Sequence, residues 1–151
     1  MAGLWLSLLA SAGLPASEGD ALGDAQAAIE SVLEQDSRLG AERNEATRHM
    51  PIARVIEQYV AGLDALDLAS CPEDFMLAMR RHRDAWQASV KFFEAYPELR
   101  GEMHEVFERI RAQGAAARSG LEGAEAAIWG TWAEVENAVQ GHAPAGEGDP
   151  G

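Results

Sequence analysis

The sequence predicts an all-α protein, a bundle of four to five helices that run mostly antiparallel in up-and-down order. Alanine is abundant and β-branched residues are sparse among the 151 residues, which favours helix over strand. Apolar residues recur every three or four positions in several stretches, as the buried face of a helix requires. Hydrophobic residues make up 47% of the chain, enough for one folded core.

The N-terminal residues 1–17 carry no charged side chain and contain a short apolar run over residues 4–10. The run is followed by Ala10-Ser11-Ala12, an A-x-A cleavage pattern. This predicts a secretory signal peptide and a periplasmic or secreted protein. The usual preceding basic residues are missing, so an apolar arm on a cytoplasmic protein is the alternative. The run is too short to span a bilayer, and we expect no transmembrane segment.

Residues 18–141 are expected to form a single helical domain. Residues 142–151, which are rich in glycine and proline, are expected to form a disordered tail. Residues 37–50 are polar and are interpreted as a connection between helices, with a partly helical connection as the alternative. The apolar spacing predicts helices over residues 20–36, 51–66, 72–95, 97–113 and 116–140. Gly114 is expected to form a break between the last two, and the alternative is that residues 115–117 continue the helix.

The clearest helix runs over residues 72–95. Ser70 and Glu73 have the S-x-x-E spacing of a capping box, so we expect Ser70 to cap this helix. Tyr96-Pro97 should end it, because a residue before proline avoids the helical region. Its predicted buried face consists of six positions: Phe75, Met79, His82, Trp86, either Ser89 or Val90, and Phe93.

The chain is strongly acidic, with 12 Lys and Arg against 25 Asp and Glu and a net charge of -13. This charge opposes binding to nucleic acid and to anionic lipid. Arg80, Arg81 and Arg83 form the densest group of cations. They either pair with acidic neighbouring helices on a solvated face, or form a site for an anion or an acidic partner.

His82 lies in the predicted apolar face, one turn from both Met79 and Trp86. One interpretation is a buried histidine that is hydrogen-bonded to a neighbouring helix. The other is a ligand or general base, in a small-molecule, haem or metal pocket built from Met79, His82, Trp86 and Trp132. No H-E-x-x-H and no pair of E-x-x-H motifs occurs, and we expect the acidic residues on outer faces. We therefore predict no metal and no cofactor.

Cys71 is the only cysteine, which excludes an intramolecular disulfide. At a helix start, the dipole is expected to lower the pKa of its thiol. Three roles remain open for it: a small residue packed against the next helix, a link between two chains of a homodimer, or a reactive nucleophile.

Trp129 and Trp132 lie three residues apart on the last helix. We expect both to pack against Trp86 in a wide core. The alternative is that one of them is exposed or lines a groove, because exposed tryptophan is enriched at binding surfaces.

No phosphate-binding loop, dinucleotide fingerprint or hydrolase motif occurs in the sequence. The sequence therefore predicts a small, exported, non-enzymatic helical bundle. We expect it to bind a protein partner or to be associated with the cell envelope.

Overall fold

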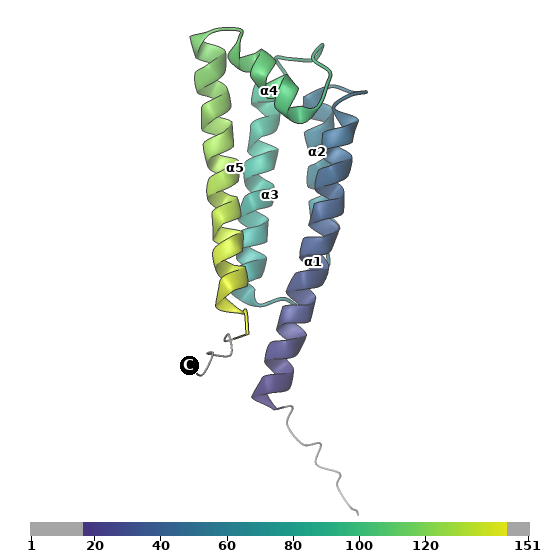
Figure 1. Ribbon diagram of the computed structural model, residues 1–151, viewed down its shortest axis with the longest axis vertical. Helices are drawn as coiled ribbons and strands as arrows, with labels where there is room; N and C mark the ends of the chain where they lie inside the picture. Colours follow the sequence, from purple (N-terminus) through teal and green to yellow (C-terminus); the bar gives the residue numbers. More distant parts are fainter. Residues whose placement is uncertain (1–16, 145–151) are drawn as a thin grey trace, which may run out of the picture.

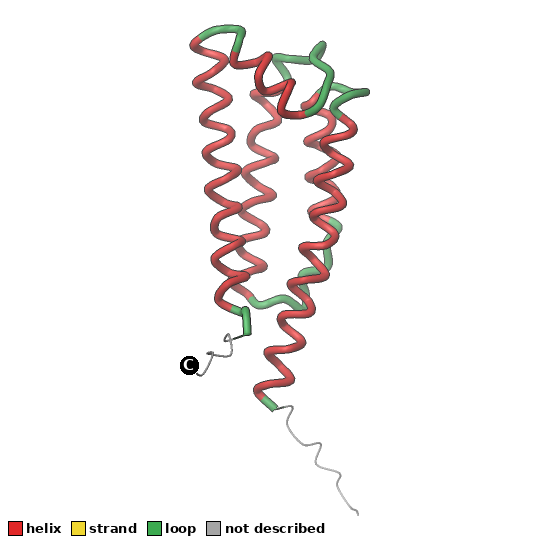
Figure 2. Tube along the Cα trace, viewed as in Figure 1, coloured by secondary structure: helices red, strands yellow, loops and turns green. Residues whose placement is uncertain are grey.

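The computed structural model describes residues 17–144 and contains five helices, labelled in Figure 1. Residues 1–16 of the predicted signal peptide lie outside the described residues, as does most of the predicted tail. Within residues 17–144 there are helices, turns and loops but no strand (Figure 2), which confirms the all-α prediction. The helices are α1 Glu18–Ala46, α2 Ile52–Asp64, α3 Glu73–Phe93, α4 Met103–Arg111 and α5 Ala115–Gly141.

The four helices α1, α2, α3 and α5 alternate in direction, and the short α4 lies across one end of them (Figure 1). Extensive interfaces join α1 to α2, α2 to α3, and α3 to α5, while α4 packs on α5. Helices α1 and α5, the first and last of this series, form no comparable interface. The ring of helices is therefore open between α1 and α5. None of the helices within residues 17–144 combines the length and apolarity needed to cross a bilayer.

Helix α1 is much longer than predicted, because it continues through most of the segment interpreted as a connection. Leu39 explains the extension, since it packs against α2 where that helix has Gly62. A Cβ atom at residue 62 would lie only 2.6 Å from Leu39 Cδ2. Contact with α2 thus stabilises helical turns whose own sequence is polar.

The prediction that Ser70 caps helix α3 is wrong. Helix α3 begins at Glu73, and its N-cap residue, Pro72, makes no side-chain capping hydrogen bond. A turn precedes it, in which the Cys71 amide donates to the Leu68 carbonyl oxygen at 3.0 Å. This turn and the extended Pro72 place Ser70 two residues before the cap position.

A capping box does occur at α4, where the Glu102 amide donates to Glu105 Oε2 at 2.8 Å. This helix begins at Met103, several residues later than predicted. The intervening loop is held to the end of α1, because the Gly101 amide donates to the Thr47 carbonyl oxygen at 3.2 Å. Gly101 has a φ of 138°, a backbone angle that residues with a Cβ atom rarely adopt.

The predicted apolar face of α3 is confirmed, since all six of its residues are buried. At the α4 end of the core, the rings of Phe93 and Phe107 stack with centroids 5.6 Å apart. The predicted break at Gly114 is also confirmed, because α4 and α5 are separate helices with Gly114 at a φ of 132° between them.

Candidate functional site

A chain of polar and aromatic side chains, here called the polar chain, crosses the bundle from α1 to α5. The Tyr59 hydroxyl donates to Asp36 Oδ1 at 2.7 Å. The Tyr59 ring meets the Trp86 ring edge-on, with centroids 5.3 Å apart. Trp86 Nε1–H donates to His82 Nε2 at 3.1 Å, and His82 Nδ1 lies 3.0 Å from Thr131 Oγ1 on α5.

These contacts define the protonation of His82. Indole N–H can only donate, so His82 Nε2 is an acceptor and the proton lies on Nδ1, which donates to Thr131. The Thr131 hydroxyl in turn donates to the Ile128 carbonyl oxygen at 2.9 Å. Burial lowers the pKa of His82, which favours the neutral ring. This is the geometry of a buried histidine that is hydrogen-bonded to a neighbouring helix.

The polar chain includes residues that the sequence did not single out. The expectation that acidic residues lie on outer faces is wrong for Asp36, which is only 9% exposed. It is tolerated there because the Tyr59 hydroxyl donates to its carboxylate. A signal existed in the sequence: Asp36 and Arg43 continue the helical spacing of the buried residues Ile29 and Val32.

Arg43, on the last turns of α1, covers the outer side of the polar chain. Its guanidinium carbon lies 4.5 Å from the centroid of the Tyr59 ring and 4.4 Å from that of Trp86. Its side chain also donates to Asn44 Oδ1 at 3.3 and 3.4 Å. Burial lowers the pKa of Arg43, while Tyr59 and Asp36 oppose that shift. Arginine nevertheless stays charged at physiological pH.

A cavity of about 330 Å³ lies next to Arg43 in the opening between α1 and α5. We call it the α1/α5 cavity. Its apolar lining consists of Trp86 from α3, Met103 and Phe107 from α4, and Trp129 from α5. Trp86 is 2% exposed, whereas Trp129 is 57% exposed. The expectation that both C-terminal tryptophans pack in the core is therefore wrong for Trp129.

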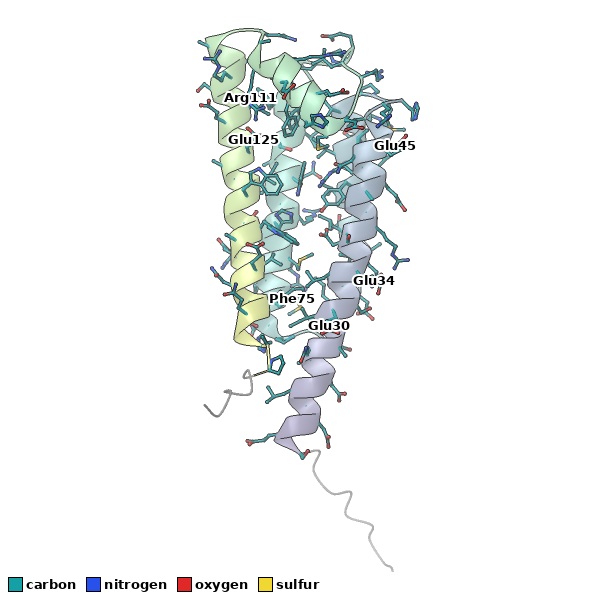
Figure 3. All side chains as sticks on the ribbon, viewed as in Figure 1. Glu30, Glu34, Glu45, Phe75, Arg111 and Glu125 are labelled. Carbon is teal, nitrogen blue, oxygen red and sulfur yellow. The ribbon has the colours of Figure 1, made fainter. Side chains whose placement is uncertain are left out.

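The charged groups of this cavity differ in how well they are paired. Arg111 Nη2 donates to both carboxylate oxygens of Glu125, at 2.7 and 2.8 Å. Figure 3 shows this pair at the end of the bundle that α4 covers. Glu108 is exposed on α4. No Asp or Glu of residues 17–144 lies within ion-pair distance of Arg43.

The four residues of the predicted pocket do not line one cavity. Trp86 lines the α1/α5 cavity, but Met79 lines a separate cavity of about 280 Å³ between α2 and α3. His82 is 3% exposed. Trp132 is half-buried, and its ring centroid lies 5.1 Å from that of His82.

The arginine cluster on α3 is largely paired within the chain. Arg81 Nη1 lies 2.9 Å from Glu134 on α5. Arg83 donates to both carboxylate oxygens of Asp64 on α2, at 2.8 and 2.9 Å. Arg80 lines the cavity that also contains Met79. These contacts agree with the interpretation that the cations pair with acidic neighbouring helices.

Cys71 is half-buried and packs against the hydrophobic core. The expectation of a lowered thiol pKa is wrong. Burial raises the pKa of Cys71, and the nearby Asp67 carboxylate adds to the rise. The helix dipole does not offset these effects, because α3 begins two residues later, at Glu73.

Within the described part of the chain, no three His, Cys, Asp or Glu side chains are grouped so that they could hold a metal ion. Comparison of the chain with protein-family models, with curated proteins and with solved structures finds no match in any of the three.

Proposed function

We propose that the protein is a non-enzymatic binding protein that holds a small ligand in the α1/α5 cavity. The observation that carries the proposal is the open ring of helices, with an exposed Trp129 on one wall and, on the other, Arg43, whose charge has no carboxylate within ion-pair distance. Ligand sites are typically concave and mostly apolar, hold a few polar groups, and enclose roughly 300–1,000 Å³. At about 330 Å³, this cavity suits a ligand at the small end of that range.

The surroundings of His82 and Cys71, the two residues considered for catalysis, support a non-enzymatic role. Both ring nitrogens of His82 are engaged in the polar chain, with Trp86 and with Thr131. Neither nitrogen is free to accept a proton from a substrate or to bind haem or metal. The raised pKa of Cys71 opposes formation of the reactive thiolate.

We further propose that the protein is exported to the periplasm or secreted, which rests on the sequence of residues 1–17. A protein partner, an association with the cell envelope and a homodimer stay predictions.

The binding proposal is tested by titrating the protein with 1-octanol, a small neutral amphiphile, while recording tryptophan emission and thermal unfolding. We expect a saturable emission change and a rise in Tm, because a ligand that binds only the folded state stabilises it. Trp129→Ala should weaken this binding. The matched control is Leu77→Ala, which alters another exposed apolar residue that does not line the α1/α5 cavity. Equal binding to both variants would contradict the proposal.

A further inference from the structure

We infer that the α1/α5 cavity selects ligands that carry one carboxylate on an apolar body, and that Arg43 binds the carboxylate. The inference rests on the proposed function, because it names the ligand class for the same cavity.

The first argument is that Arg43 is held ready for a planar anion. Its guanidinium lies over the rings of both Tyr59 and Trp86, at 4.5 and 4.4 Å from their centroids. Such contacts attract a cation to the faces of aromatic rings and restrict its orientation. The N–H groups at the edge of a guanidinium form the fork that matches a carboxylate. Arg43 also lines the cavity, so its donors are close to a bound ligand.

The second argument is that the charge of Arg43 has no carboxylate beside it. Asp36 attracts the guanidinium from a distance, but Asp36 Oδ1 already accepts from Tyr59. Asn44 offers only a neutral amide oxygen. On the facing wall, by contrast, the charge of Arg111 is balanced by Glu125. A cation that is partly removed from water favours a counter-charge, so a bound carboxylate would be stabilised at Arg43 rather than at Arg111.

The third argument concerns the body of the ligand. Met103 and Phe107 on α4, with Trp86 and Trp129, form an apolar surface beside Arg43. Trp129, which is 57% exposed, can lose much of its contact with water when a ligand covers it. A ligand that engages both features carries its charge at one end and an apolar chain or ring at the other.

The remaining charges work against any general attraction of anions. The chain has a net charge of -13, and the exposed Glu108 lies at the rim of the cavity. A preference for a carboxylate must therefore arise locally. This makes Arg43 and Glu108 a pair of test positions with opposite expected effects on the same ligand.

The experiment compares the dissociation constants of octanoate, 1-octanol and octylammonium, measured by tryptophan emission on the full chain. We expect octanoate to bind about tenfold more tightly than 1-octanol, which corresponds to one charge-assisted bidentate contact, about 1.4 kcal/mol. Arg43→Met should abolish this preference while 1-octanol still binds. Glu108→Gln should strengthen binding of octanoate only. The control Arg54→Met removes an exposed arginine of α2 that pairs with Glu57, and should leave the preference unchanged.

Each outcome decides between the two proposals. If 1-octanol binds in a Trp129-dependent manner but octanoate binds no better, the carboxylate inference is wrong and the proposed function stands. If octylammonium binds most tightly, the cavity selects cations and the inference is equally wrong. If none of the three ligands binds saturably, both proposals fail. Should Arg43→Met not fold, Arg43→Lys retains the charge without the planar fork and should reduce the octanoate preference without eliminating it.

Discussion

Helix α5 borders two seams of the bundle, and only one of them is closed. At the seam with α3, Gly120 allows so close an approach that a Cβ atom there would lie 2.4 Å from Phe92 Cε2. Leu121, Ile128 and Val135 of α5 are buried in the same hydrophobic core as the apolar residues of α3. At the seam with α1, the same helix presents Glu125 and Trp129 to the α1/α5 cavity.

The difference shows how one helix serves two purposes. Small and branched apolar residues on one side of α5 allow close packing against α3. On another side of α5, Trp129 and Glu125 line the α1/α5 cavity together with Arg43 of α1. Because α1 and α5 form no extensive interface, these large side chains line a cavity instead of a packed core.

Replacement of the two tryptophans should give the largest difference in the free energy of unfolding between the buried core and the open seam. Trp86→Ala should lower the free energy of unfolding by ~3–5 kcal/mol, because it removes a buried aromatic side chain. Trp129→Ala should cost less than ~1 kcal/mol, since Trp129 is mostly exposed. Denaturant unfolding measures both values. Equal losses would mean that Trp129 is packed as tightly as the buried Trp86.

The hydrogen bonds of the polar chain should have the next largest effect. His82→Leu should destabilise the fold by ~1–3 kcal/mol, because Trp86 Nε1–H is buried and would lose its acceptor. In a Trp86→Phe background the donor is absent, so the same change at residue 82 should cost clearly less. A double-mutant cycle by denaturant unfolding measures this coupling. Independent, additive losses would show that the hydrogen bond contributes little.

The lowered pKa of His82 predicts how stability changes with pH. The unfolded chain binds a proton near pH 6.5, whereas the folded chain does so only at lower pH. Stability should therefore fall as the pH decreases below about 6.5, by at most ~1.4 kcal/mol per pH unit. Around His82, Asp36 favours the protonated ring and Arg43 disfavours it.

Unfolding experiments between pH 5 and 7 check this prediction, with His82→Leu as the variant that should lack the slope. Asp74 provides an internal contrast, because a hydrogen bond with His142 lowers the pKa of its carboxyl group. Its contribution should be lost only at the more acidic pH where carboxylates titrate. A slope near pH 6 that persists in His82→Leu would have to come from other groups.

The surface arginines should have the smallest effect. Arg81 and Glu134, which form an ion pair between α3 and α5, are both well exposed. Arg81→Ala should change the free energy of unfolding by less than ~1 kcal/mol, because water and salt screen such pairs. Thermal unfolding at low and high salt measures this. A loss comparable with that of His82→Leu would show that the ion pair closes the α3/α5 seam.

Much of the fold was predictable because helix patterns are local. The apolar spacing from Phe75 to Phe93 predicted α3 and its buried face, and Gly114 predicted the break before α5. The errors occurred where the chain depends on distant contacts. The second half of α1 is polar, and it is helical where Leu39 packs against Gly62 of another helix.

The candidate site was predictable only in part. Trp86 was singled out, and one exposed tryptophan on the last helix was among the alternatives. Asp36 and Arg43 were missed, because charged residues at buried spacing resemble ordinary solvent-facing ones until their aromatic partners are known. Tyr59 of α2 contacts both Asp36 and Arg43, and it lies sixteen residues beyond Arg43 in the sequence.

The sequence by itself determined that the chain is helical and which residues of α3 are buried, because apolar periodicity acts within a few turns of one helix. Only the tertiary structure decided that α1 and α5 stay apart and that Arg43 lies over the rings of Tyr59 and Trp86 without a carboxylate beside it. Those features depend on how four helices are placed around the core. That placement results from the sum of many side-chain contacts between segments far apart in the chain, which no local pattern records.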